Sequence, residues 1–143
     1  MSELEGDKVK NFFKRSLKNL QLYEDQHANN PETYKYEVTM MLNSLLGILV
    51  VLKEKTKVLD NVDISFLNYT DTTKNFFRHM RNSISHGHFI DYIKVDKKTK
   101  EIASIEFVDI DPETKRETFR HELSVRELTI LINNINKVVN GIR

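Results

Sequence analysis

The sequence has 143 residues, the size of a single domain, and its 22 basic and 21 acidic side chains leave a net charge of +1. Cysteine is absent, which excludes disulfide scaffolds, thiol nucleophiles and cysteine-based zinc sites. The balanced charge also excludes a protein that coats long nucleic acid non-specifically, so any contact with nucleic acid must be local.

Apolar residues recur at helical spacing in two N-terminal segments and predict helices over about 7–25 and 31–55. Asn30 and Pro31 provide an N-cap and a first-turn proline for the second of these helices. Its most apolar stretch, 45–52, is far shorter than the roughly 20 residues that a membrane span needs. The acidic first residues do not resemble a signal peptide. We therefore expect a cytoplasmic protein with no membrane partner.

A third helix is predicted over about 71–87. Asp71 is a suitable cap for its first turn. Gly87 is a natural end, because glycine adopts the left-handed conformation after a helix at little cost.

After Gly87 the apolar period changes from helical to alternating, which predicts an antiparallel β meander over about 89–123. A capping box, Ser124-x-x-Glu127, then begins a last helix over about 125–140. A meander this small cannot fold alone and must pack on the helices. The sequence thus predicts a mainly α single domain over 1–143, a four-helix bundle with the meander inserted before the last helix. The expected strands are 89–95, 102–110 and 117–123.

One segment of the third helix has an unusual composition. No acidic residue occurs between Asp71 and Asp91, while the segment holds Lys74, Arg78, Arg81 and three of the five histidines. Fixed cations, imidazoles and neutral polar groups together suit an anion, of which phosphate is the commonest. The alternative is a solvated basic face whose charges complement the helix dipole.

The order of residues in this segment favours the first interpretation. An R-N-S-I-S-H string begins at Arg81, ends at His86 and is followed by Gly87. It resembles the Arg-x(4–6)-His signature of the HEPN superfamily, which often has asparagine after the arginine. The surrounding residues are similar to those of small stand-alone HEPN proteins from bacterial and mobile-element defence systems. HEPN folds are helical bundles of four or five helices, in agreement with the predicted frame.

The resemblance implies a metal-independent endoribonuclease that works as a homodimer, without a cofactor, as a toxin or phage-defence effector. Arg81 would hold the scissile phosphate, and His86 would act as base on the 2′-hydroxyl or acid on the leaving 5′-oxygen. Asn82 would orient His86 or donate to a phosphate oxygen. Arg81 and His86 lie roughly 140° apart on an ideal helix, so a second chain, or unwinding near Gly87, would complete the site. Candidate substrate-binding residues are Lys74, Arg78, Ser85 and His88.

Other interpretations stay open from the sequence. The same fold could be a non-catalytic HEPN-like module that binds RNA, a nucleotide or a protein partner. An antitoxin or regulatory protein is a further candidate partner. Some HEPN toxins carry a modified tyrosine two residues after the histidine, but that position is His88 here. A metal site formed by His79, His86, His88 and His121 is not expected, because neither cysteine nor carboxylate lies nearby in the sequence.

Overall fold

The computed structural model describes residues 42–49 and 58–141, together with Lys8, Asn11, Lys14, Arg15 and Lys18. These five single residues are helical and exposed, and residues 42–49 are also helical. Most of the helices predicted over 7–25 and 31–55, with the Asn30-Pro31 start, lies outside the described residues. The chain divides into two units, one of residues 63–131 and the other of residues 1–62 with 132–143.

Helix α3 (Thr73–Ser85) provides the 63–131 unit with its principal helix. Its N-cap is Thr72 rather than the predicted Asp71, because the Thr72 hydroxyl accepts a hydrogen bond from the Asn75 amide at 3.1 Å. Asp71 supports this cap from one residue earlier, accepting from the Thr72 amide and the Asn75 side chain. These bonds lower the pKa of the Asp71 carboxyl. The helix ends as predicted near Gly87, whose φ of +70° is left-handed.

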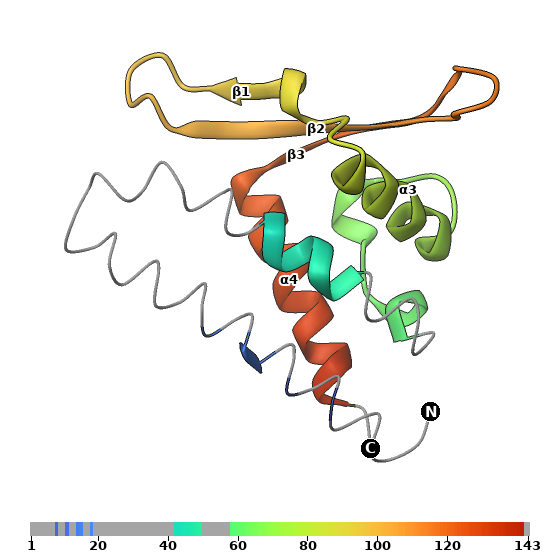
Figure 1. Cartoon of the computed structure of the whole chain (residues 1–143). Helices are drawn as coiled ribbons and strands as arrows, with labels where there is room; N and C mark the ends of the chain where they lie inside the picture. Colours follow the sequence, from blue (N-terminus) through green and yellow to red (C-terminus); the bar gives the residue numbers. More distant parts are fainter. Residues whose placement is uncertain are drawn as a thin grey trace. The chain divides into compact units, whose positions relative to one another are not determined.

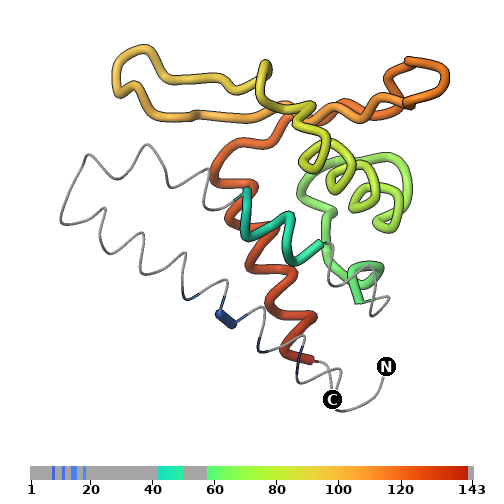
Figure 2. The backbone as a smooth tube through the Cα atoms, in the orientation of Figure 1, coloured from blue at the N-terminus to red at the C-terminus, as the bar shows by residue number. Residues whose placement is uncertain are grey.

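Three antiparallel strands follow, β1 (Ile93–Val95), β2 (Ile102–Ile110) and β3 (Glu117–Ser124), in the order β1-β2-β3. The first strand is shorter than predicted because Ile90–Tyr92 forms a 3₁₀ turn, with the Tyr92 amide bonded to the Phe89 carbonyl. The two hairpin loops project at opposite ends of the sheet (Figure 2).

The two hairpin loops have the same internal bonding. Asp96 accepts hydrogen bonds from the two backbone amides two and three residues later, and Asp111 does the same in the second loop. Lys100 and Lys115 each occupy the left-handed region four residues after the aspartate. A shared Asp-x-x-Thr-Lys sequence therefore builds the same turn twice.

The sheet supplies one layer of the core of the 63–131 unit, and α3 packs against β2 (Figure 1). The chain is thus an α+β protein, and the predicted four-helix bundle is wrong. The apolar patterns predicted helices that bury one another, with the meander packed on the outside of that bundle. In the structure the strands themselves contribute fully buried residues. The buried apolar residues of this unit are Ile64, Leu67, Phe76, Phe77, Met80, Ile84, Ile105, Phe107, Val108, Phe119, Leu123, Leu128 and Leu131.

Helix α4 (Val125–Asn140) begins in the 63–131 unit directly after β3 and continues into the other unit. Its start is the predicted capping box: the Glu127 amide donates to the Ser124 hydroxyl and the Ser124 amide donates to the Glu127 carboxylate. In the second unit the buried apolar residues include Leu45, Leu49 and Ile135. Across the described residues, none of the helices has the length and apolar character to cross a membrane.

Candidate functional site

The polar face of α3 carries most of the residues singled out in the sequence, and its apolar face turns into the core. Lys74, Arg78 and Ser85 are exposed, while Arg81 and Asn82 are half-buried. His79 departs from this division because it is a titratable side chain with only 6% of its surface exposed. A buried imidazole requires hydrogen-bond partners, and its surroundings define the site.

His79 is held by a carboxylate from the sheet. Its Nδ1 lies 2.8 Å from Oδ2 of Asp109 on β2, and Asp109 is also 6% exposed. Its Nε2 lies 3.3 Å from Nη2 of Arg78. Because a guanidinium can only donate, Nε2 must accept, and the ring proton therefore lies on Nδ1 and is donated to Asp109.

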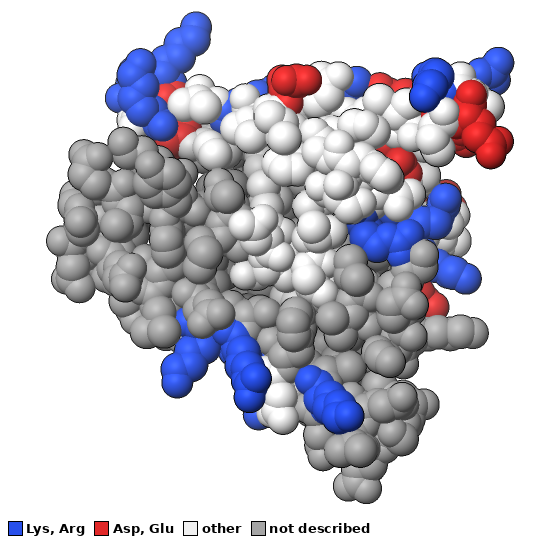
Figure 3. Space-filling view, viewed as in Figure 1, with Lys and Arg blue, Asp and Glu red and all other residues white. Residues whose placement is uncertain are grey.

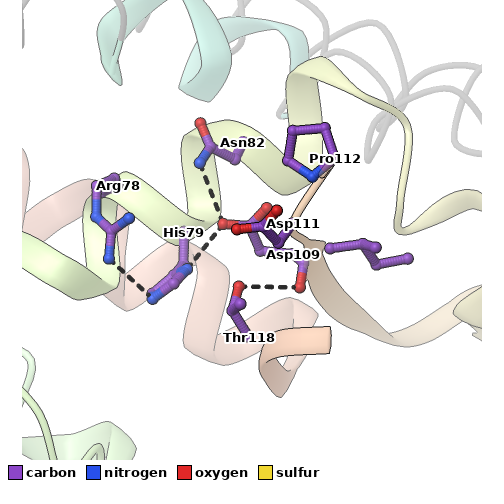
Figure 4. A pocket seen from close by; sticks show the side chains of 8 residues that line it. Arg78, His79, Asn82, Asp109, Asp111, Pro112 and Thr118 are labelled. Carbon is purple, nitrogen blue, oxygen red and sulfur yellow. Dashed lines mark hydrogen bonds and ion pairs between the residues drawn. The ribbon is translucent and has the colours of Figure 1, made fainter. Parts of the chain in front are cut away.

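Asp109 also holds the asparagine of the predicted motif. Nδ2 of Asn82 donates to the same Asp109 oxygen at 3.1 Å, and Oδ1 of Asn82 accepts from Nη2 of Arg81 at 3.3 Å. A continuous line of hydrogen bonds thus runs from Arg78 to Arg81 through one buried carboxylate. Figure 4 shows His79 and Asn82 converging on Asp109 from the same helix.

A pocket of about 230 Å³ opens beside this network (Figure 4). Its walls come from the polar face of α3, from the end of β2 and its hairpin loop, and from β3. The residues that line it are Arg78, His79, Asn82, Asp109, Ile110, Asp111, Pro112 and Thr118.

The position of Asp109 explains why it points toward α3. It follows Ile105 and Phe107 at every second place along β2, so it lies on the face that those two residues bury. The pairing of β2 with β3 also shifts directly after Asp109, where Thr118 is the extra residue of a bulge. The Thr118 hydroxyl donates to the Asp109 carbonyl at 3.2 Å.

Sequence reasoning missed Asp109. The stretch between Asp71 and Asp91 lacks acidic residues, which predicts a cluster of cations, imidazoles and neutral polar groups, yet folding brings a carboxylate to it from β2. One signal in the sequence could have revealed it. Asp109 occupies a place in the alternating pattern where an apolar residue is expected, and a buried carboxylate must have partners.

Beyond α3, the chain forms a second cluster around the predicted catalytic histidine. His86 is the C-cap of the helix and is exposed, and its ring stacks on that of His88 with 5.7 Å between centroids. Within the described residues, Nδ1 of His88 is buried without a hydrogen-bond partner. The rings lie side by side because Gly87 between them turns the chain.

The same loop is tied to β2. The Val108 amide donates to the Ser83 hydroxyl at 3.0 Å and to the His88 carbonyl at 3.2 Å. β1 pairs only with the first part of β2, so the loop after α3 occupies the edge that β1 leaves open. Val108 and Asp109 therefore fix both the end of the helix and the loop that follows it.

The predicted site residues form two groups. Arg78 and Asn82 line the pocket, and Arg81 contacts Asn82. His86 and His88 contact each other. Lys74 and Ser85 are exposed and are not part of the pocket lining. The Asn82 side chain bonds Asp109 and Arg81, whereas the resemblance suggested that it orients His86 or donates to a phosphate oxygen.

The remaining histidine of the described region extends the buried network as an aromatic stack. The His79 ring lies parallel to that of Phe119, with centroids 4.9 Å apart, and Phe119 in turn stacks on His121. Burial lowers the pKa of His121, while the charge of Glu127 acts in the opposite direction.

In the part of the chain that the structure describes, no group of three or more histidine, aspartate or glutamate side chains is arranged to hold a metal ion.

Comparison with known protein families identifies a family for the chain. A protein-family model described as HEPN pEK499 p136 matches residues 1–142, which is nearly the whole chain. No curated protein and no solved structure matches the sequence significantly.

Proposed function

Because the chain belongs to the HEPN pEK499 p136 family, we propose that it is a metal-independent endoribonuclease. The observation that carries the proposal is the arrangement of the R-N-S-I-S-H string at the end of α3. Arg81 is half-buried with its guanidinium held by Asn82, while His86 stands exposed at the C-cap. A fixed cation and an accessible imidazole are the two groups that phosphodiester cleavage without a metal requires.

In the proposed reaction the 2′-oxygen of a ribose attacks the adjacent phosphorus, and the bond from phosphorus to the 5′-oxygen breaks. The 2′-hydroxyl loses its proton and the leaving 5′-oxygen gains one; His86 serves as the base or as the acid, and water exchanges the other proton. Arg81 stabilises the negative charge that grows on the phosphate oxygens. The products are a 2′,3′-cyclic phosphate and a free 5′-hydroxyl, so DNA, which lacks the nucleophile, is not cut.

We further propose that two copies of the chain share each site. The His86 amide donates to the Asn82 carbonyl at 3.0 Å, so helical geometry continues through His86 and the chain turns only at Gly87. Arg81 and His86 therefore stay roughly 140° apart around the helix axis. This geometry argues against unwinding as the way to bring them together, and it favours Arg81 of one copy acting with His86 of another.

The direct test incubates purified protein with labelled single-stranded RNA and the matching DNA in EDTA. We expect cleavage of RNA alone by the wild type and loss of cleavage in Arg81→Ala and His86→Ala. Arg126→Ala, which removes an exposed arginine of α4, is the matched control and should cut normally. Cleavage that persists in both site variants would reject the assignment. RNA binding without cleavage by the wild type would favour a non-catalytic binding module.

The shared site has a separate test by mixing. Arg81→Ala and His86→Ala are each inactive alone, but a mixed dimer contains one site with both residues intact if each site combines residues of two copies. Cleavage should therefore return in part when the two variants are mixed. No recovery, with subunit exchange verified by differently tagged chains, would place both residues of a site in one chain.

A role as a toxin or phage-defence effector follows from the same proposal, and regulation by a partner protein would then be needed to spare the host. Induced expression in bacteria should arrest growth with the wild type and not with His86→Ala at equal protein level. Equal growth of the two cultures would argue against a toxic ribonuclease.

A further inference from the structure

The buried carboxylate of Asp109 has no part in the proposed reaction, yet it joins the sheet to the motif on α3. We propose that Asp109 is a positioning residue that orients Arg81 through Asn82 and Arg78 through His79. The inserted sheet would then belong to the active site, because it sets the direction of both guanidinium groups toward the RNA phosphate. This inference rests on the proposed ribonuclease function.

The branch to Arg81 depends on the two ends of the Asn82 amide. An ionised carboxylate can only accept hydrogen bonds, so Asp109 requires the NH₂ end of the amide at 3.1 Å. The carbonyl end must then face the opposite way, where it accepts from Nη2 of Arg81 at 3.3 Å. If the amide flipped, its NH₂ group would face the guanidinium of Arg81, donor against donor. Its oxygen would face the Asp109 carboxylate, acceptor against acceptor. Asp109 thereby keeps an acceptor in front of Arg81.

The branch to Arg78 follows the same logic. Asp109 requires a donor from His79 at 2.8 Å, which places a proton on Nδ1, so in the neutral ring the lone pair lies on Nε2. Nε2 then accepts from Nη2 of Arg78 at 3.3 Å. Asp109 can only accept hydrogen bonds. It therefore orients the Asn82 amide and the His79 ring so that each of them presents an acceptor to an arginine.

Packing alone gives no reason for a carboxylate at this position. Asp109 lies on the face of β2 that Ile105 and Phe107 bury, where an apolar side chain would match the pattern, and it is 6% exposed. Burying a carboxylate is costly unless it is paired and hydrogen-bonded. The strand itself is already fixed to α3 by the Val108 amide, which bonds Ser83.

The test replaces Asp109 in two ways and measures RNA cleavage. Asp109→Ala removes the acceptor, and we expect kcat/KM to fall by up to about 100-fold through misplacement of the arginines. Asp109→Asn keeps an oxygen that can accept both bonds, so it should retain most of the activity. Glu106→Ala is the matched control on the same strand, because it removes a carboxylate bonded to Arg120, and it should cleave normally. Unchanged kcat/KM in Asp109→Ala would overturn the proposal.

A double substitution separates positioning from general loss of structure. If Asp109 acts through Asn82, then Asn82→Ala combined with Asp109→Ala should lose less activity than the product of the two single losses. Thermal unfolding of each variant identifies the temperatures at which it is fully folded, and cleavage is compared only there. Multiplicative losses would show that the two residues act independently and would overturn the proposal.

A measurement without RNA tests the positioning role of Asp109 separately from the proposed ribonuclease activity. In isotope-labelled protein, the Nε–Hε signals of Arg81 and Arg78 report whether each guanidinium is held. Asp109→Ala should shift and sharpen these signals toward those of a freely rotating arginine, and Glu106→Ala should leave them unchanged. Unchanged signals in Asp109→Ala would overturn the positioning role. Failure of the wild type to cut RNA would overturn the function alone.

Discussion

The two histidine clusters of the 63–131 unit are built in opposite ways. Around His79, an imidazole and a carboxylate are each 6% exposed, and both ring nitrogens have partners. Around His86, the ring is exposed and stacks on His88, whose Nδ1 has no partner among the described residues. The first arrangement holds its groups in one geometry. The second leaves the His86 ring accessible from solvent, which is what proton transfer to or from a substrate requires.

The sequence alone would not separate the two clusters, because His79 and His86 are both histidines of one short segment. Their difference comes from which face of α3 each residue occupies and from the sheet that reaches one of them. The comparison therefore predicts that loss of the buried His79 ring affects stability first, and that loss of the exposed His86 ring affects chemistry first.

The largest effect is expected for His86→Ala. Loss of a positioned acid or base should lower the rate of RNA cleavage by about 10²- to 10⁴-fold. Since the side chain is exposed, the free energy of unfolding should change by less than about 0.5 kcal/mol. Single-turnover cleavage and denaturant unfolding of the same preparation measure both quantities. A large loss of stability would show that the two clusters do not differ as described.

The converse prediction concerns His79→Ala, which removes the ring stacked on Phe119 and leaves Asp109 without its donor. We expect the free energy of unfolding to fall by about 2–4 kcal/mol, from lost packing and from an unsatisfied buried carboxylate. Urea unfolding followed by circular dichroism measures this. Arg78→Ala is the control, because it removes only the exposed partner of the same ring and should cost far less.

A smaller effect tests whether β2 joins the two clusters. Ser83→Ala removes the hydroxyl that accepts a hydrogen bond from the Val108 amide. The His88 carbonyl still accepts a hydrogen bond from the same amide. The cost should therefore stay near 1 kcal/mol. Hydrogen exchange of the Val108 amide should become faster, and the His88 ring signals should shift. An unchanged exchange rate would mean that the Ser83 bond does not hold the loop.

The sequence predicted the local features of this region well. The turn at Gly87, the capping box at Ser124 and the bounds of β2 all follow from short-range patterns, because the residues concerned interact with close neighbours in the chain. The repeated Asp-x-x-Thr-Lys loops belong to the same class. The hydrogen bonds that the Asp96 and Asp111 side chains accept in the two loops join residues two or three positions apart.

The architecture and the buried network were not predictable in the same way. Whether strands cover helices or helices cover one another depends on contacts between distant residues, and the bundle prediction failed there. Asp109 lies 30 residues from His79 and 27 from Asn82. The only local sign of it is an aspartate in place of an apolar residue. The catalytic roles of Arg81 and His86 stay predictions.

The two hairpin loops have the same hydrogen bonding but differ in charge. The loop after β1 carries Lys97, Lys98 and Lys100, whereas the loop after β2 combines Glu113 with Lys115 and Arg116. In the space-filling view basic side chains accordingly dominate one end of the sheet, and both signs occur at the other (Figure 3). Because the two loops share their hydrogen bonding and a left-handed lysine, a comparison between them separates the effect of charge from that of shape. If the chain binds RNA as proposed, the first loop carries the more favourable charge for it.

The smallest effect should appear in the pH dependence of stability. Burial lowers the pKa of His121, which belongs to the aromatic stack beneath His79, so the unfolded chain binds the proton more readily than the folded one. The free energy of unfolding should therefore fall as the pH drops below the ordinary histidine value of about 6.5, and this contribution should be constant above it. The hairpin carboxyls Asp96 and Asp111 also have lowered pKa values, but they titrate in a more acidic range.

Urea unfolding between about pH 5 and pH 7 isolates the histidine contribution, and His121→Gln should remove that part of the slope. A slope that persists in His121→Gln and disappears in His86→Ala would assign the pH sensitivity to the exposed cluster instead, and the contrast between the two clusters would then fail.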